Sequence, residues 1–585
     1  MKFPKNVLAL PLAASLMIPT AAFAHNGEDH SGSTAPIQAA AHGTFLLTDT
    51  PAAELRIGVE TALTEHGFLA VEVMQKGADG AEDFDQAAAA LFANSDDIAA
   101  AISTLYGQEG GAAFLEIWNS HIGYLVDYVT AANAGDQAGM DQALADLEEY
   151  KTEQAAFFES ATDGRLPAAA LEEGLTMHID QLLKAFDAYK AGDFETAYMQ
   201  EREAIHHMSM FGETLSIAVA DQFPTVVQNT NPDTPAADLR SHLNHLFTEH
   251  AGLAVMAMQD GIDGAESFEQ SAGALLANAD DLSAAVASVY GEEAGEAFSD
   301  IWTSHIGYFV DYVTATAENS KSGRDKAKAD LDEYIVEQAA FLEAATDGRI
   351  PAEALEAGLT EHVGQLLSAF DSYVTGDYDT AYDALRESYA HMTMPAAGLS
   401  AAIVDQFPSE FLGDTPFTDV SGRYQDAVAY LYFKTITNGL TDTRYGVDQP
   451  LSRIDAAIMI AKSTEMIDSD STMKSPFTDV PARGEAAVAA LEEADIINGK
   501  TATMFDSFAT ITRGEAALIL ANAYDVPATS QKAGFTDVSS RYQDAVNRLD
   551  AAGIVSGKSA SKFGTMDQVT RGELALMIYQ LEMME

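Results

Sequence analysis

The sequence predicts an all-α protein, in which two tandem helical bundles precede three shorter, mostly helical modules. Residues 118–128 recur as residues 302–312, an offset of 184 residues that also relates His66 to His250 and Pro224 to Pro408 without a gap. After Pro408, a Phe-Thr-Asp-Val motif occurs three times, at spacings of 60 and 58 residues. Within both long repeats the apolar residues follow helical spacing rather than strict alternation, which favours helices over strands.

The composition narrows the classes of function. The chain has 585 residues, no cysteine and a formal net charge of −59. Without cysteine, disulfides and thiolate metal sites are excluded, so any metal must be held by histidine, methionine or carboxylate. The negative charge disfavours nucleic acid and anionic lipid as partners, and it suits cations, high salt or an alkaline medium.

Residues 1–24 have the features of a secretory signal. Lys2 and Lys5 precede an apolar run, and Ala-Phe-Ala24 precedes the expected cleavage before His25. No later apolar run is long enough to cross a bilayer, so we expect an exported protein that is soluble or wall-bound. Residues 25–48 form a polar, flexible lead-in. A free amino group beside the His25 imidazole could hold copper there, and a plain disordered tail is the alternative.

The long repeats span residues 49–224 and 233–408, and a linker at 225–232 joins them. Asn94 is suited to a helix N-cap, Gly107 to a helix stop and Pro167 to a first turn. The motifs of each repeat follow one order, which includes Trp-x-Ser-His121-Ile and His207-Met-x-Met in the first repeat. In this order of motifs, both repeats resemble a family of exported or envelope-associated bacterial helical proteins. The resemblance supports the fold and brings no chemistry with it. In the first repeat we expect helices near 52–77, 82–93, 95–106, 110–133, 137–161, 167–189 and 194–221.

A linker at 409–416 leads to three modules, at 417–466, 477–526 and 535–585. Each has Phe-Thr-Asp-Val, a turn with Asn-Gly or Ser-Gly, and a motif with Arg followed two residues later by Asp or Glu. These modules resemble S-layer homology (SLH) modules. The resemblance implies a pseudo-trimer that attaches the protein non-covalently to a pyruvylated secondary cell-wall polymer. It also implies that six motif residues line the binding grooves: Asp419, Arg453, Asp479, Arg513, Asp537 and Arg571.

The arginines suit this role, because a guanidinium can bind a carboxylate through two parallel hydrogen bonds. The first module departs from the pattern with Ser452-Arg453-Ile454-Asp455, so its groove differs in sequence from the other two. The alternative is that the arginines are structural and pair with a nearby carboxylate such as Glu515 or Glu573.

Each long repeat places one histidine on each of four helices, on apolar faces. Four inward-facing imidazoles could meet in a bundle core and hold a transition metal. Two methionines beside the fourth histidine favour copper, because thioether and imidazole suit Cu(I). The alternative is an ordinary core, in which the histidines are hydrogen-bonded and the methionines fill space. The candidate ligands are His66, His121, His178, His207, Met208 and Met210, and His250, His305, His362, His391, Met392 and Met394.

Other patterns point away from an enzyme. A di-iron site needs Glu-x-x-His on two helices, and only Glu203-x-x-His206 has that spacing. The spacing of His242 and His245 suits a metal, but the first repeat has Gly58 and Thr61 at those positions, so we take it as incidental. We therefore expect a cell-surface protein that displays two bundles capable of binding copper or another transition metal. A purely structural S-layer or envelope protein in contact with other envelope proteins is the alternative, and a surface oxidoreductase comes third.

Overall fold

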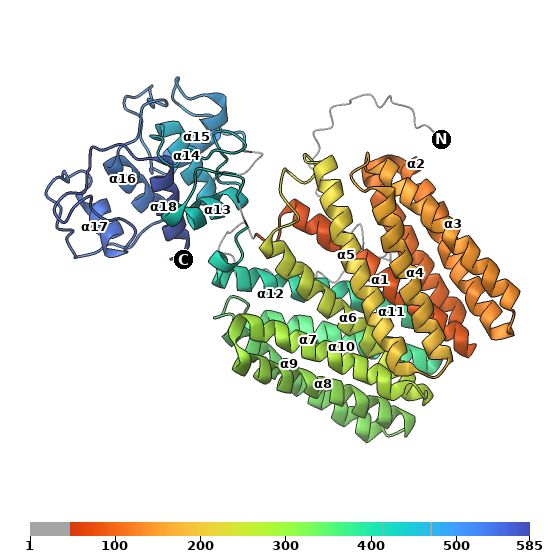
Figure 1. The fold of residues 1–585 in the computed structure, drawn as a ribbon. Helices are drawn as coiled ribbons and strands as arrows, with labels where there is room; N and C mark the ends of the chain where they lie inside the picture. The colour runs from red at the N-terminus through yellow and green to blue at the C-terminus, as the bar shows by residue number, and fades with distance from the viewer. Residues whose placement is uncertain (1–46, 414, 468–470, 585) are drawn as a thin grey trace. The chain divides into compact units, whose positions relative to one another are not determined.

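The computed structural model describes residues 47–413, 415–467 and 471–584, and the predicted signal and most of the lead-in lie outside these ranges. Within them the regular structure is helical, as predicted, with isolated β-bridges only in the C-terminal part. None of the helices in these ranges combines the length and hydrophobicity needed to span a membrane. Residues 48–233 and 237–403 form one compact unit, and residues 404–585 form most of a second (Figure 1).

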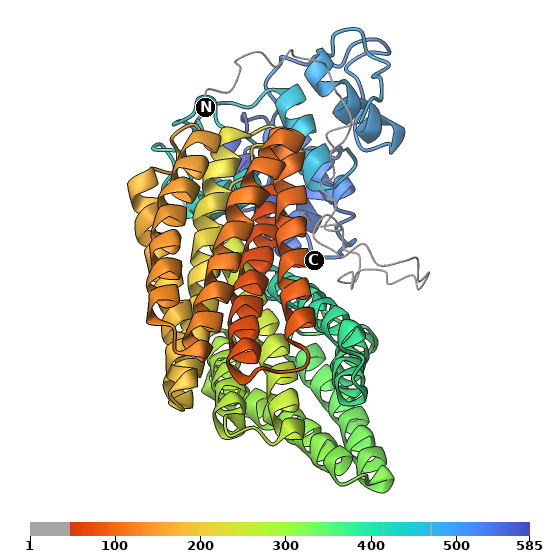
Figure 2. The ribbon, with the colours of Figure 1, turned by 90° about the vertical axis from the view of Figure 1, so that its right-hand side faces the viewer.

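The first repeat contains five helices that pack along their lengths (Figure 2). They begin and end at residues with the expected capping chemistry. The Thr50 hydroxyl accepts a hydrogen bond from the Ala53 N–H before a first-turn proline, and Gly80 closes the same helix in the left-handed conformation. The helices are α1 (Pro51–Asp79), α2 (Phe84–Ala134), α3 (Gln137–Ala161), α4 (Ala168–Lys190) and α5 (Phe194–Gln222).

The predicted boundary at Asn94 was wrong, because α2 continues through it. The Asn94 side chain is buried, and its Nδ2 donates to the Ala62 carbonyl at 2.9 Å and to a Glu65 carboxylate oxygen at 2.7 Å. The polar residue is therefore a cross-link to α1 rather than a cap. The break predicted at Gly107 is present, since this residue has φ 79° and ψ 167° inside α2.

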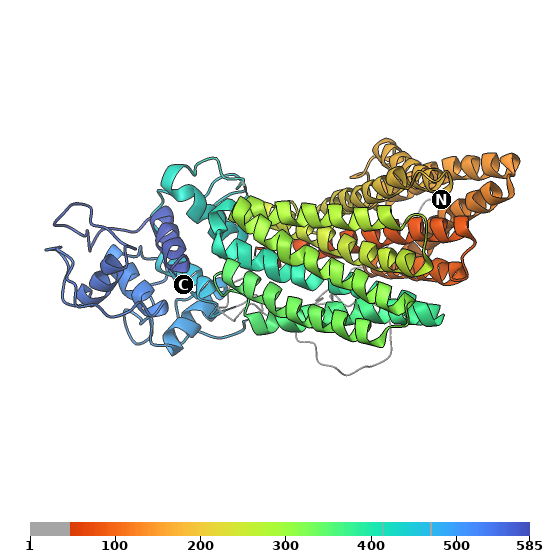
Figure 3. The same cartoon turned by 90° about the horizontal axis from the view of Figure 1, so that it is seen from below.

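The second repeat has the same plan (Figure 3). Gly291, the counterpart of Gly107, has φ 91° and ψ 163° and here divides the helix in two, and one further interruption has no counterpart in the first repeat. Where α5 is continuous, the second repeat divides its last helix at Met392, just before Pro395 in the sequence. Proline lacks the N–H that the helix needs and its ring crowds the preceding turn, which explains the break. The helices are α6 (Pro235–Asp263), α7 (Phe268–Tyr290), α8 (Glu292–Ala317), α9 (Lys321–Ala345), α10 (Ala352–Thr375), α11 (Tyr378–His391) and α12 (Thr393–Gln406).

The two repeats contact each other through reciprocal ion pairs. Arg202 of the first repeat binds Glu249 and Asp281 of the second at 2.9 and 2.7 Å. Arg386, which corresponds to Arg202, binds Glu65 and Asp97, which correspond to Glu249 and Asp281, at 2.9 and 2.8 Å. Such reciprocity is the signature of an isologous, two-fold interface. The tandem repeats thus pair as an internal pseudo-dimer.

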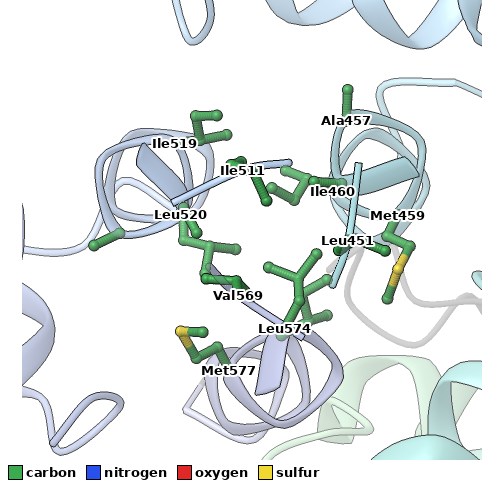
Figure 4. Packing of buried hydrophobic residues seen from close by; sticks show 14 of the residues in the cluster. Leu451, Ala457, Met459, Ile460, Ile511, Ile519, Leu520, Val569, Leu574 and Met577 are labelled. Carbon is green, nitrogen blue, oxygen red and sulfur yellow. The ribbon is translucent and has the colours of Figure 1, made fainter. Parts of the chain in front are cut away.

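The C-terminal unit joins its three modules in a closed ring. Three short segments exchange backbone hydrogen bonds in a cycle: Leu451 N–H to the Val569 carbonyl, Val569 N–H to the Ile511 carbonyl, and Ile511 N–H to the Leu451 carbonyl, at 2.9 to 3.1 Å. Their side chains meet between three helices in one apolar core (Figure 4). The helices are α13 (Gln425–Phe433), α14 (Arg453–Ser463), α15 (Glu485–Glu493), α16 (Arg513–Ala523), α17 (Gln543–Ala551) and α18 (Arg571–Glu582), with 3-10 turns at Pro408–Glu410, Gly422–Tyr424 and Ala482–Gly484.

Candidate metal centres and arginine sites

Three histidines meet in the core of the first repeat. His66 on α1, His121 on α2 and His178 on α4 are 0, 0 and 2% exposed. One ring nitrogen of each lies within 4.8 Å of the other two, so the three form a compact group that we call the first triad. The Nε2 atoms of His66 and His121 are 3.2 Å apart.

The hydrogen bonds of the first triad leave nitrogen lone pairs available for an ion. The Nδ1 of His121 lies against the Trp118 carbonyl oxygen and is therefore the protonated nitrogen, which leaves the Nε2 lone pair facing His66. His66 Nδ1 and both ring nitrogens of His178 are buried without a hydrogen-bond partner. Buried polar atoms are rarely left in this state, because each costs about 1–3 kcal/mol. A backbone carbonyl that fixes one nitrogen is also the usual support of a metal-binding histidine.

Burial keeps the triad histidines neutral. It lowers the pKa of His121 to about 4, against a smaller opposing effect of the hydrogen bond to Trp118. Burial, with the neighbouring imidazoles, lowers the pKa of His66 and His178 well below the ordinary value of 6.5. At neutral pH all three are therefore in the deprotonated form that binds metals.

The second repeat builds the same group from His250, His305 and His362, the second triad. The Nε2 atoms of His250 and His305 are 3.3 Å apart, and both ring nitrogens of His362 again lack a partner. A cavity of about 30 Å³ borders His250 and His305 and is otherwise apolar, with Met258 in its wall. That volume is enough for one water-sized occupant.

The fourth histidine of each repeat lies outside the triad, which differs from the predicted four-fold convergence. The ring of His207 is 6.5 Å from that of His178, and its Nε2 bonds the Gly174 carbonyl oxygen. His391 bonds the Gly358 carbonyl oxygen in the same way. His207 lies on α5, which packs against α4, and His391 lies on α11, which packs against α10. This packing brings each ring near the triad histidine of the neighbouring helix, but the ring bonds a backbone carbonyl of that helix.

The predicted methionine ligands differ in their burial. Met210 is 45% exposed, because it lies two residues after the buried Met208 on α5 and two residues turn a side chain by about 200° around the helix. Met394 is half-buried. Met208 and Met392 are buried. Met258, eight positions after His250 on α6, lines the cavity that borders His250 and His305.

Aromatic rings enclose the triads, and the sequence analysis did not assign them this role. Tyr150 stacks on His121 with ring centroids 4.6 Å apart, and Trp118 packs against His66 at the same distance. Tyr334 and Trp302 repeat both contacts in the second triad. The Trp-x-x-His spacing was the available signal, since residues three apart share a helix face.

The motif arginines of the C-terminal unit each reach into the following module. Arg453 Nε donates to the Phe505 carbonyl at 3.0 Å, Arg513 Nε to the Phe563 carbonyl at 3.1 Å, and Arg571 Nε to the Tyr445 carbonyl at 3.1 Å. Each guanidinium also lies over the aromatic ring of that same residue, 4.6 to 4.8 Å from its centroid. The third module thus closes on the first.

The motif aspartates hold the loops that receive these arginines. Asp479 accepts hydrogen bonds from the backbone N–H groups of Phe505 and Ser507, at 2.7 and 3.0 Å. Asp419 and Asp537 accept two backbone N–H bonds each from the corresponding residues of their own modules. The carboxylates therefore bind backbone N–H groups, and they shape the loops that receive the arginines.

Two of the three arginines are paired with a glutamate, as the alternative interpretation expected. Arg453 lies 3.4 Å from Glu515 and Arg513 lies 3.5 Å from Glu573. At Arg571 the equivalent carboxylate would be Asp455, which is one methylene shorter and binds Arg483 at 2.6 Å instead. Within the described ranges, no ion pair is found at Arg571.

Comparison with known proteins supports the identity of this unit. The S-layer homology domain family matches residues 416–457, 476–517 and 534–575. The chain carries three SLH domains. It is 40% identical over 76 residues to a "Cell surface protein" of Thermoanaerobacter kivui, which covers 12% of this chain and 10% of that protein. It is 34% identical over 104 residues to a "Surface-layer 125 kDa protein" of Lysinibacillus sphaericus, covering 17% of this chain and 9% of the relative.

A third similarity is to an "Amylopullulanase" of Thermoanaerobacterium thermosulfurigenes, 27% identical over 222 residues, 36% of this chain and 11% of that enzyme. The chain therefore spans about a tenth of the length of each of these relatives. Together the SLH domains and the surface-layer relatives place the chain among proteins associated with the cell surface or cell wall.

Proposed function

We propose that the SLH domains anchor this protein to a pyruvylated secondary cell-wall polymer, and that each bundle binds one transition-metal ion, copper being favoured, at its three-histidine group. The observation that carries the metal proposal is the set of buried ring nitrogens that have no hydrogen-bond partner, repeated in both triads. A bound ion would accept their lone pairs and remove the cost of leaving them unpaired.

Three neutral imidazoles without a carboxylate or thiolate suit zinc as well as copper, and the thioether of Met258 near the second triad favours copper. Among the described residues, no carboxylate joins either triad. Glu65 and Glu249, which directly precede the first histidine of each triad, are engaged by Arg386 and Arg202.

The test is the metal content of the full-length protein after loading with Cu(I), Cu(II), Zn(II) or Fe(II), compared with a His178→Leu/His362→Leu variant. Leucine is close to histidine in volume and removes the two unpaired ring nitrogens at each of these positions. The proposal expects two equivalents in the parent that the variant lacks. It also expects opposite effects on thermal stability: the variant is more stable than the metal-free parent and less stable than the loaded parent.

A matched control is His207→Asn/His391→Asn, which changes the histidines adjacent to the triads and should retain both equivalents. Equal metal content in the parent and the His178→Leu/His362→Leu variant would contradict the proposal. An absence of metal in both would leave the triads as stacked core residues of a structural surface protein.

The proposed polymer contact rests on the donors that the arginines retain. Nε and Nη2 of each guanidinium bind backbone or side-chain oxygens, so Nη1 remains for an anion. At Arg453 and Arg513 that atom faces a glutamate, whereas at Arg571 no carboxylate competes among the described residues. We therefore assign the strongest carboxylate-binding groove to Arg571.

Co-sedimentation of the full-length protein with purified cell wall tests this assignment. Arg571→Lys keeps the charge but loses the planar pair of donors, and it should weaken binding more than Arg513→Lys. Wall from which the pyruvyl groups have been removed should bind the parent no better than the variant. Equal effects of the two substitutions would refute the ranking of the grooves.

A further inference from the structure

A large cavity lies between the two repeats, outside both triads. Its volume is about 910 Å³, and its walls come from α5 of the first repeat and from α6 and α7 of the second. His206 on α5 and His242 and His245 on α6 border it, and the rings of His206 and His245 are 5.2 Å apart. Glu203, one turn before His206, borders the same cavity.

These histidines are exceptional within the tandem repeat. Every other histidine of the described ranges has a counterpart 184 residues away, whereas the counterparts of His206, His242 and His245 are Ala390, Gly58 and Thr61. The reciprocal ion pairs of the pseudo-dimer are kept on both sides. The two repeats therefore pair through contacts that do not need the three imidazoles.

The chemistry of the cavity suits a cation. His245 is 8% exposed, and its Nδ1 is buried without a hydrogen-bond partner. Arg202, the cation in the wall, is neutralised by Glu249 and Asp281. Burial is the largest of the effects that lower the pKa of His245 to about 4, so its ring is a neutral ligand at pH 7.

We propose that His206, His242 and His245 bind a divalent transition-metal ion in this cavity, with Glu203 or water completing the coordination. Two helices each contribute a pair of residues at i and i+3, Glu203 with His206 and His242 with His245, which is a spacing that puts both members of a pair on one face. The ring nitrogens are less closely gathered than those of the triads. His206 and His242 are exposed, so their rings are free to turn toward His245 when an ion enters.

This site differs from the triads in access and in symmetry. The triads are closed to solvent and occur twice, whereas the cavity is open and its three histidines occur once per chain. An ion in the cavity should therefore exchange with chelators quickly, and the full-length protein should take one such ion. The proposal does not depend on whether the triads bind metal.

The test is equilibrium binding of Zn²⁺ to the full-length protein at pH 7.5, measured by dialysis, with Ca²⁺ as a second probe. The variant replaces two histidines with the residues of the other repeat, His206→Ala and His245→Thr, which the pseudo-dimer already tolerates on its other side. The expected result is a loss of one rapidly exchanging equivalent of Zn²⁺, with an unchanged circular dichroism spectrum and thermal midpoint in the metal-free state.

A His178→Leu/His362→Leu variant should keep this equivalent, which separates the cavity from the triads. Equal Zn²⁺ binding by the parent and the His206→Ala/His245→Thr variant would overturn the proposal. Displacement of Zn²⁺ by millimolar Ca²⁺ would also overturn it, because that result would assign binding to the carboxylates alone.

Discussion

Removing the Arg386 side chain should destabilise the pairing of the two repeats by about 3–5 kcal/mol, the usual cost of breaking a buried ion pair from one side. The Arg386 side chain is 6% exposed and that of Glu65 is 12% exposed. Arg386→Ala deletes two hydrogen bonds to Glu65, at 2.9 and 3.3 Å, and one to Asp97 at 2.8 Å. Among the described residues, the Asn94 amide is then the side-chain donor that Glu65 keeps.

Urea unfolding followed by tryptophan fluorescence is suited to this prediction, because each repeat contains one of the chain's two tryptophans, Trp118 and Trp302. Arg386→Ala should lower the unfolding midpoint. The control Arg165→Ala breaks an ion pair within the first repeat, in which Arg165 and Asp221 are 31% and 72% exposed. Its effect should not exceed about 1 kcal/mol.

A double variant tests whether the unpaired Glu65 carboxylate causes the loss of stability. Arg386→Ala combined with Glu65→Gln should recover part of the lost stability, since no unpaired carboxylate remains in the interface. If Arg386→Ala and Arg165→Ala lower the midpoint equally, the interface pair is not the buried contact that the geometry indicates.

Three further predictions concern other parts of the chain. Burial, with nearby Glu72, raises the pKa of Glu201 well above its ordinary value, so the native state holds a proton that the unfolded chain releases. Stability from this group is complete below about pH 4.5 and is lost as the pH rises toward the folded-state pKa; Glu201→Gln should therefore flatten the fall in thermal midpoint between pH 4.5 and 8. A fall that is just as steep in the variant would assign it to other groups. Gly107→Ala should cost about 1–3 kcal/mol in urea unfolding, because φ 79° and ψ 167° suit glycine alone although no atom blocks a Cβ there; an unchanged midpoint would show that the break in α2 is relaxed. Asp479→Ala removes two N–H acceptors under the Arg453 site, so it should lower wall co-sedimentation although it does not touch the guanidinium; full binding would show that the loop holds its shape alone.

Repeated sequence patterns predicted the helices and modules. Contacts between side chains of different helices could not be predicted from the sequence. Helical spacing and the 184-residue offset predicted the bundles, and the Arg and Asp motifs predicted the three modules. Asn94 was misread as a cap because its partner, Glu65, lies on another helix. The residue type at position 94 does not reveal a hydrogen-bond partner on another helix.

The same limit explains the candidate sites. Three of the four predicted histidines of each repeat do converge, but the fourth is drawn to a backbone carbonyl that no sequence pattern reveals. The sequence alone favours an incidental spacing for His242 and His245, because the other repeat lacks both histidines. Only the fold shows that they face His206 across a cavity, and the missing counterparts then favour a specific role.

The cyclic hydrogen bonds of Leu451, Val569 and Ile511 have a consequence for how the protein could be released. Because Arg571 of the last module completes the site built on the Tyr445 loop of the first, two residues that lie 126 positions apart in the sequence depend on each other. A protease that removed α18 would open the circle and dismantle a groove whose other wall lies far upstream in the chain. One cut would then release the protein from the wall completely, rather than weakening its attachment in steps.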